Sequence, residues 1–205
     1  MEVARDVAEV MDVLESLYAS KRKDVGVSLL AKCLRSVWFK MQTGQDIVTD
    51  VMIHGTERHH WMERHFPQEL EKRGYRCMPE VKVTYGDVAG YVDLMCEKDL
   101  MRYVFEFKFT SNPSESNPFM LQYRKQLEYY AAMADAVGVL ILSDFNIERS
   151  YTEVIVLSKE DRERVLSELM RRYDVIRSGE EPAPEYGPWC KFCAFKNRCM
   201  NRRLI

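Results

Sequence analysis

The feature that most constrains the fold of this sequence is a run of three neighbouring segments in which apolar and polar residues alternate. The segments cover residues 76–85, 88–96 and 102–110. A period of two is typical of strands that bury one face. Gly86-Asp87 separates the first two segments and suits the tight turn of a hairpin. The sequence therefore predicts three consecutive strands.

Segments with helical periodicity surround these strands. Three precede the strands and two follow them, at residues 3–18, 28–41, 56–72, 119–136 and 159–177. Ser28 suits the N-cap of the second helix, which would hold Cys33 in its first turns, and Gly44 suits its end. Two shorter strand patterns lie at 137–142 and 151–157. This order predicts an α/β or α+β fold with a mixed sheet flanked by helices.

The composition excludes several classes of protein. The chain has 205 residues, a net charge of −2 and 46% hydrophobic residues, so bulk disorder and general affinity for polyanions are not expected. Its longest apolar stretch, 136–142, is far shorter than a membrane span. The acidic residues 1–15 lack the basic and apolar regions of a signal peptide, so a cytoplasmic location without membrane association is predicted.

Two Glu-x-Lys triplets occur in the predicted strands, and only one has an acidic partner. Glu106 and Lys108 would share one strand face. A hairpin centred on Asp99 and Leu100 would bring Asp93 opposite Glu106. Two adjacent carboxylates repel unless a cation lies between them, so this pair predicts a site for a hard divalent metal. The simpler alternative is a solvated ion pair on the surface.

The residues around this pair resemble the motifs of PD-(D/E)xK nucleases. Gly90-Tyr91-Val92-Asp93 followed by Glu106-Phe107-Lys108 resembles the core motif of that family. Two further segments resemble helix motifs of its RecB-like branch: residues 55–59 resemble Gly-x-x-x-His, and residues 126–130 resemble Gln-x-x-x-Tyr. The resemblance implies a restriction-endonuclease-like mixed sheet flanked by helices.

The resemblance also implies a role for each matching residue. His59, Asp93, Glu106 and the carbonyl of Phe107 would bind one or two Mg²⁺ or Mn²⁺ ions, and Lys108 would orient or activate the attacking water. An imidazole ligand favours Mn²⁺ over Mg²⁺. The remaining two residues, Gln126 and Tyr130, would share a helix face and contact substrate phosphates. His60 or His65 could replace His59, and Tyr129 could replace Tyr130.

The cysteines indicate a second metal centre. Cys190-x-x-Cys193 and Cys199 have the spacing of a metal or cluster site that lacks one ligand. Three cysteines could supply it, namely Cys33, Cys77 and Cys96. The last two lie in strand patterns and are expected to be small buried hydrophobic residues. Spacing alone does not separate iron-sulfur from zinc.

The cysteine arrangement resembles that of the iron-sulfur RecB-like nucleases, and the chain length resembles the CRISPR-associated exonuclease family called Cas four. The resemblance implies an iron-sulfur cluster bound by Cys33, Cys190, Cys193 and Cys199. It does not decide between 4Fe-4S and 2Fe-2S, of which 4Fe-4S is the preferred prediction. This cluster would staple the two ends of the chain together. The predicted organisation of the chain is an N-terminal helical segment (1–54), a RecB-like nuclease core (55–178), and a linker with the C-terminal cysteine segment (179–205).

The predicted function is that of a metal-dependent DNA exonuclease that trims single-stranded ends before CRISPR spacer integration. The 5′ to 3′ polarity and the CRISPR integrase partners are implied by the resemblance alone. Basic and aromatic residues of the tail, 189–203, would track the DNA backbone or form a solvated basic terminus. The alternatives are a stand-alone repair nuclease of the same fold and a non-catalytic DNA-binding module built on an iron-sulfur or zinc site.

Overall fold

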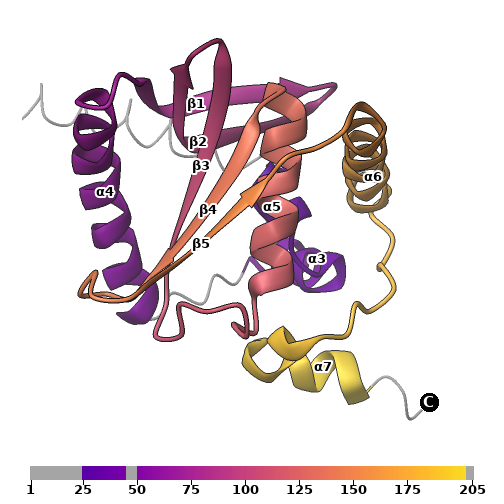
Figure 1. Ribbon diagram of the computed structural model, residues 1–205. Coiled ribbons are helices and arrows are strands. Elements are labelled where there is room, and N and C mark those ends of the chain that lie inside the picture. The colour runs from indigo at the N-terminus through magenta and orange to yellow at the C-terminus, as the bar shows by residue number, and fades with distance from the viewer. Residues whose placement is uncertain (1–24, 45–49, 202–205) are drawn as a thin grey trace, which may run out of the picture.

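A five-stranded mixed sheet forms the centre of the computed structural model, which describes residues 25–44 and 50–201 (Figure 1). The strands lie side by side in chain order: β1 (Arg76–Tyr85), β2 (Val88–Lys98), β3 (Met101–Phe109), β4 (Val137–Ser143) and β5 (Ser150–Ile155). β3 and β4 are parallel, and the helix α5 (Met120–Ala134) connects them, because parallel neighbours need a crossover. The predicted strands and the α/β class are confirmed.

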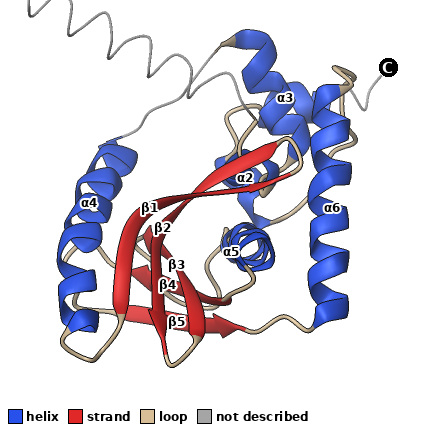
Figure 2. Cartoon of the chain, turned by 90° about the horizontal axis from the view of Figure 1, so that it is seen from above, coloured by secondary structure: helices blue, strands red, loops and turns tan. Residues whose placement is uncertain are grey.

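Helices cover both faces of the sheet (Figure 2). α4 (Asp50–Glu71) packs on one face through Met62 against Phe105 and Phe107 of β3. α5 and α6 (Lys159–Arg177) pack on the opposite face, together with α2 (Val27–Leu30) and α3 (Leu34–Thr43). The alternation along β3 is the reason for two cores, since its aromatic residues face α4 and its other residues face α5.

The single helix predicted at 28–41 is wrong, because the structure has two short helices there. Gly26, not Ser28, is the N-cap of α2, and Cys33 is the N-cap of α3. At the break, backbone carbonyls lack partners within a helix. Arg172 of α6 donates to the carbonyl of Lys32 and, at 2.6 Å, to that of Leu30. A long-range hydrogen bond therefore stabilises a break that local periodicity does not predict.

Most other predicted helix boundaries agree with the structure to within a few residues. Gly44 ends α3 in the left-handed region, with φ 64°, as expected. α4 begins earlier than predicted, at Asp50, and continues through Pro67. The helix predicted at 3–18 lies outside the described residues. None of the helices in the described ranges is long and apolar enough to cross a membrane.

Cys77 and Cys96 are expected from the sequence to be small buried hydrophobic residues, and Cys96 is fully buried, but the two form a disulfide that this expectation does not include. Tyr85 pairs with Val88 across the hairpin turn, and the same register carried along the two strands places the cysteines opposite each other. The alternation within one strand predicts that a cysteine is buried. It does not predict which residue lies opposite that cysteine, because this depends on the register of the two strands. The pairing leaves the other cysteines free.

Candidate active site

The β2–β3 hairpin brings two carboxylates together. Its turn residues, Asp99 and Leu100, have φ values of 49° and 65°, as a two-residue turn requires. The last paired residues on the ladder are Leu94 and Phe105, so Asp93 and Glu106 occupy the next position. There the Phe107 N–H donates to Asp93 Oδ2 at 2.7 Å. The register expected from the sequence is confirmed.

Glu106 is the most deeply buried acidic group of this site, with only 1% of its surface exposed. Its Oε1 accepts from the Lys108 ammonium and from Gln126 Nε2, the latter at 2.8 Å. Its Oε2 is buried without a hydrogen-bond partner among the described residues. Burial, and then the charge of Asp93, raise the pKa of Glu106 to about 7. An unpartnered, buried carboxylate oxygen of this kind fits a cation.

Lys108 lies two residues beyond Glu106 and on the same face of β3. Burial lowers its pKa, but the charges of Glu106 and Asp93 outweigh that effect, so the pKa lies above its ordinary value. Its Nζ also lies 5.6 Å from the centre of the Tyr123 ring. The ammonium group is therefore charged and fixed beside the carboxylates.

α4 contributes His59 from the opposite edge of the site. Its Nε2 lies 2.9 Å from Asp93 Oδ2. Burial lowers the pKa of this imidazole, yet its hydrogen bond to Asp93 and the charges of Asp93 and Glu63 raise it above its ordinary value. Of the alternatives, the His60 side chain is 58% exposed and contacts Glu63, and the His65 ring packs against Trp61. Only His59 among these histidines contacts Asp93.

α5 contributes Gln126 and Tyr130, which are one helical turn apart and both line the same cavity. Tyr129 is not among the residues that line it. A side chain at Gly90 would place its Cβ 2.6 Å from the Tyr130 ring. The glycine of the strand motif is thus required by the close approach of the tyrosine of the helix motif.

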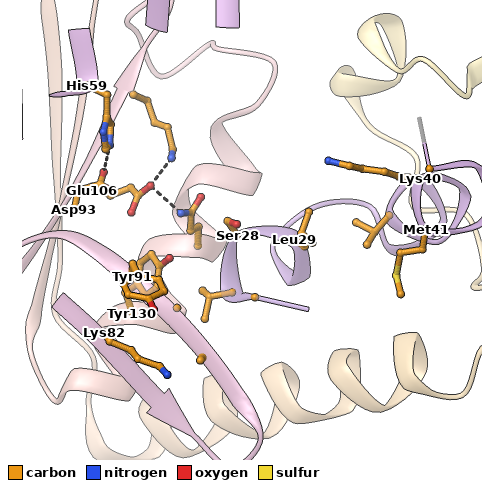
Figure 3. Close-up of a pocket in the computed structure, with 18 residues that line it drawn as sticks. Ser28, Leu29, Lys40, Met41, His59, Lys82, Tyr91, Asp93, Glu106 and Tyr130 are labelled. Carbon is orange, nitrogen blue, oxygen red and sulfur yellow. Dashed lines mark hydrogen bonds and ion pairs between the residues drawn. The ribbon is translucent and has the colours of Figure 1, made fainter. Parts of the chain in front are cut away.

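The carboxylates line the wall of a cavity of about 840 Å³ (Figure 3). The cavity extends from this wall past Ser28 and Leu29 to Lys40 at the end of α3. The β1–β2 hairpin adds Lys82 and Tyr91, which are paired across the strands. Lys82, part of the second Glu-x-Lys triplet, was not predicted at the site because its triplet lacks an acidic partner in the sequence.

Comparison with known proteins identifies the family of this chain. The sequence matches the profile of the PD-(D/E)XK nuclease superfamily over residues 10–200. The chain belongs to this superfamily. No curated protein sequence matches it significantly.

Solved structures share the superfamily fold. The crystal structure of SSO0001 has a TM-score of 0.63 and 17% identity, with 86% of this chain and 85% of that one covered. An alkaline exonuclease (LHK-Exo) from Laribacter hongkongensis has a TM-score of 0.55 and 12% identity, with 80% of this chain and 93% of that one covered. At these identities the likeness concerns the fold.

This superfamily member also gathers its four free cysteines in one region. Cys33 is at the start of α3, and Cys190, Cys193 and Cys199 lie in or beside η1 (Pro188–Phe192) and α7 (Lys196–Asn201). Burial raises the pKa of the Cys193 thiol, and the other three thiols raise it further. Arg35 Nη1 lies 3.9 Å from Cys199 Sγ. The structure therefore brings together the four cysteines that the sequence predicts as one ligand set.

The segment between α6 and η1 contacts the start of α3. Glu185 Oε2 accepts from the Leu34 N–H at 3.2 Å, and the Glu185 carboxylate also accepts from Arg172. Arg35 Nε donates to the Pro182 carbonyl at 2.8 Å. Residues 178–188, expected to be a simple linker, thus run along α3 and fix it next to the cysteine segment.

Part of the predicted DNA-tracking tail makes contacts within the protein. The Arg198 guanidinium lies 4.5 Å from the centre of the Phe39 ring, and Phe195 packs on the same ring at 5.5 Å. Phe192 remains 65% exposed. Residues 202 and 203 lie outside the described residues. The role of the tail as a DNA track is accordingly weakened for Arg198 and Phe195.

Proposed function

We propose that this protein is a divalent-metal-dependent DNA exonuclease that acts on single-stranded ends. The observation that carries the proposal is the buried Oε2 of Glu106, which has no hydrogen-bond partner within residues 25–44 and 50–201 and belongs, like Asp93, to the wall of an open cavity. Membership of the nuclease superfamily supports the same reaction class.

Four groups would hold the metal ion: the carboxylates of Asp93 and Glu106, Nε2 of His59 and the carbonyl of Phe107. The donor set fits a divalent ion, since both carboxylates line one cavity and Glu106 Oε2 has no hydrogen-bond partner among the described residues. The imidazole favours Mn²⁺ over Mg²⁺. When bound, the ion lowers the pKa of a water molecule and neutralises charge on the phosphate.

The protein's own groups supply the remaining chemistry. Lys108 keeps its proton and provides a fixed positive charge beside the position of a substrate phosphate. Gln126 donates to Glu106 Oε1 and not to Oε2, the oxygen proposed for the metal ion. Tyr130 packs on Gly90 and defines the wall against which the substrate would rest.

The residues that line the cavity favour single-stranded DNA as the substrate. Lys82 and Lys40 offer positive charge for backbone phosphates, and Tyr91, 46% exposed, offers a ring for stacking of an unpaired base. Stacking of this kind needs bases that are not paired in a duplex. The predicted 5′ to 3′ polarity rests on the sequence resemblance.

The decisive experiment is a cleavage assay on end-labelled single strands with Mn²⁺, Mg²⁺ or EDTA. We expect cleavage with Mn²⁺, weaker cleavage with Mg²⁺, none with EDTA, and none with the Asp93→Asn protein. A circular single strand has no ends and should remain intact if the enzyme is an exonuclease. Binding of DNA without metal-dependent cleavage would instead favour the non-catalytic module.

We also propose that Cys33, Cys190, Cys193 and Cys199 bind an iron-sulfur cluster, with 4Fe-4S content. The disulfide removes Cys77 and Cys96 from the candidates for the fourth ligand, which supports Cys33. The cluster would act as a structural staple. Anaerobically purified protein should be brown and contain iron and sulfide, whereas a colourless protein with stoichiometric zinc would contradict the assignment.

The wider role in CRISPR adaptation rests on the sequence resemblance to the Cas four family. Co-purification with a CRISPR integrase from the native organism would support it. A gene neighbourhood made of DNA-repair genes would favour the stand-alone repair nuclease.

A further inference from the structure

Glu63 is a buried acidic residue of α4 that lies next to the proposed metal site. Only 8% of its surface is exposed. Its Oε1 lies 3.3 Å from Nδ1 of His59, and its Oε2 lies 3.0 Å from Nδ1 of His60. Glu63 follows His59 by four residues, so one helix face carries both side chains.

We infer that Glu63 is a positioning residue, which accepts the Nδ1–H of His59 and thereby leaves Nε2 of that ring free to bind the divalent ion. The inference rests on the proposed function, because it requires His59 to be a ligand. It adds a residue that does not itself touch the metal or the DNA.

The need for such a residue follows from the two carboxylates on either side of the ring. Asp93 Oδ2 lies 2.9 Å from Nε2 of His59, and Glu63 lies at Nδ1. A neutral imidazole carries one proton. If Asp93 captures that proton at Nε2, the nitrogen that faces the site has no lone pair for a metal. If Glu63 captures it at Nδ1, Nε2 is available.

Burial of Glu63 and packing of the His59 ring support the second tautomer. The Glu63 carboxylate is withdrawn from solvent, so its interaction with Nδ1 of His59, at 3.3 Å, is little screened by water. The His59 ring also packs edge-on against Phe107, with 6.2 Å between ring centres, which limits its rotation. His60 binds the second oxygen of Glu63, but its side chain is 58% exposed. It therefore serves as the matched control.

The experiment measures the Mn²⁺ dissociation constant by electron paramagnetic resonance in the intact protein. Glu63→Leu removes the acceptor at similar size and should weaken Mn²⁺ binding by about 10- to 100-fold. Glu63→Gln keeps an amide oxygen that can accept the Nδ1–H, so it should recover part of the loss. His60→Ala should change the dissociation constant by less than about twofold. Circular dichroism shows that each variant is folded.

The tautomer of His59 provides a second readout that does not depend on activity. Nitrogen-15 chemical shifts of metal-free protein at pH 8 should report Nδ1–H in the wild type and in Glu63→Gln. In Glu63→Leu the proton should move to Nε2, toward Asp93. A purely structural role of Glu63 would lower the thermal midpoint without this change of tautomer, and that result would overturn the inference.

His59→Ala separates the two proposals. If His59→Ala leaves Mn²⁺ affinity unchanged, His59 is not a ligand and that part of the proposed function fails. If His59→Ala weakens binding but Glu63→Leu does not, only the positioning role fails. A second bound ion that disappears in both Glu63→Leu and His60→Ala would also overturn the inference, because His59, His60 and Glu63 would then form a metal site of their own.

Discussion

The carboxylate site and the cysteine region differ in how far apart their parts lie along the chain. The Phe107 N–H and the Asp93 carboxylate, which join the two strands of the first site, are 14 residues apart. Arg35 and Cys199, which join α3 and α7 in the second, are 164 residues apart. One site is formed by a local hairpin, whereas the other requires closure of nearly the whole chain.

This difference also separates what each site contributes. Glu106 is held in the interior between the two helical layers, where burial disfavours its charge. The four free cysteines are all only partly buried. Burial of the Glu106 carboxylate therefore lowers the free energy of unfolding but prepares a site for a metal ion. The cysteine region should instead raise the free energy of unfolding. Changes to the two sites should have opposite signatures in activity and stability.

The largest effect is expected for Glu106→Gln. Loss of the carboxylate at the metal site should reduce cleavage of end-labelled single strands on the order of 1,000-fold. The thermal midpoint should change by only a few degrees, because the amide has the same size and can still bond to Lys108. Asp144→Asn is the control: Asp144 is 7% exposed but lies outside the cavity, and this variant should cleave normally. Retained cleavage by Glu106→Gln would eliminate the proposed site.

Cys190→Ala should have the opposite signature. A thiolate staple between Cys33 and Cys190 closes a loop of more than 150 residues, so its loss should lower the free energy of unfolding by about 4 kcal/mol. The cleavage activity of Cys190→Ala at low temperature should fall less than that of Glu106→Gln. Lys191→Ala, in the same turn, is the control and should unfold in urea like the wild type. Loss of cleavage with the cluster and stability intact would show that the cysteine region acts in the chemistry.

Arg172→Met should weaken the same closure from within the protein. Arg172 is 2% exposed and donates to two carbonyls at the α2–α3 break and to Glu185. Removing it leaves these acceptors buried and should cost about 3 kcal/mol in urea unfolding. Arg171→Met changes the exposed neighbour on α6 and should be nearly neutral. Equal effects of the two variants would mean that the buried contacts do not hold the chain ends together.

The pH dependence of the free energy of unfolding, measured on metal-free protein, should show how much the buried carboxylate destabilises the fold. Burial raises the pKa of Glu106 to about 7, and Asp93 helps raise that of His59. The folded protein therefore binds more protons than the unfolded chain, and its stability should fall as pH rises from about 5 to 7.5. Mn²⁺ binding should tighten over the same range because protons compete for its ligands. Glu106→Gln should show a smaller fall, and an identical profile would contradict the assignment to Glu106.

The smallest effect is expected for Lys82→Ala at the mouth of the cavity. The Lys82 side chain forms no hydrogen bond or ion pair within the described part of the chain, so its charge is available for a DNA phosphate. Its loss should weaken single-strand binding by about 3- to 10-fold and reduce the salt dependence by about one phosphate contact. Lys72→Ala, at the end of α4 and paired with Glu69, is the control in fluorescence anisotropy. An unchanged salt dependence would exclude Lys82 from the DNA path.

Several features of the fold were visible in local sequence. The period of two defined β1, β2 and β3, because alternation records which face of a strand is buried. Ser158 caps α6 by accepting from the Asp161 N–H at 3.0 Å, and that helix begins where the pattern predicts. The two-residue turn at Asp99 and Leu100 fixed the register of Asp93 and Glu106. Each of these depends on neighbours in the chain or directly across a hairpin.

Other features depend on groups that local patterns do not relate. The α2–α3 break depends on Arg172, about 140 residues away along the chain. The choice of His59 over its two neighbours on α4 depends on how that helix is rotated against the sheet. The position of Lys82 in the cavity depends on how the β1–β2 hairpin lies over α2. In each case a long-range contact selects one of several locally equivalent residues.

The sequence by itself therefore determined the strands and the acidic pair, because spacing along a strand or hairpin translates directly into geometry. Only the tertiary structure decided which histidine meets the acids, where the helix at the N-terminal end breaks, and that Glu63 lies behind His59. Those outcomes depend on the packing of helices against the sheet and on burial, which bring together groups whose separation in the chain carries no signal.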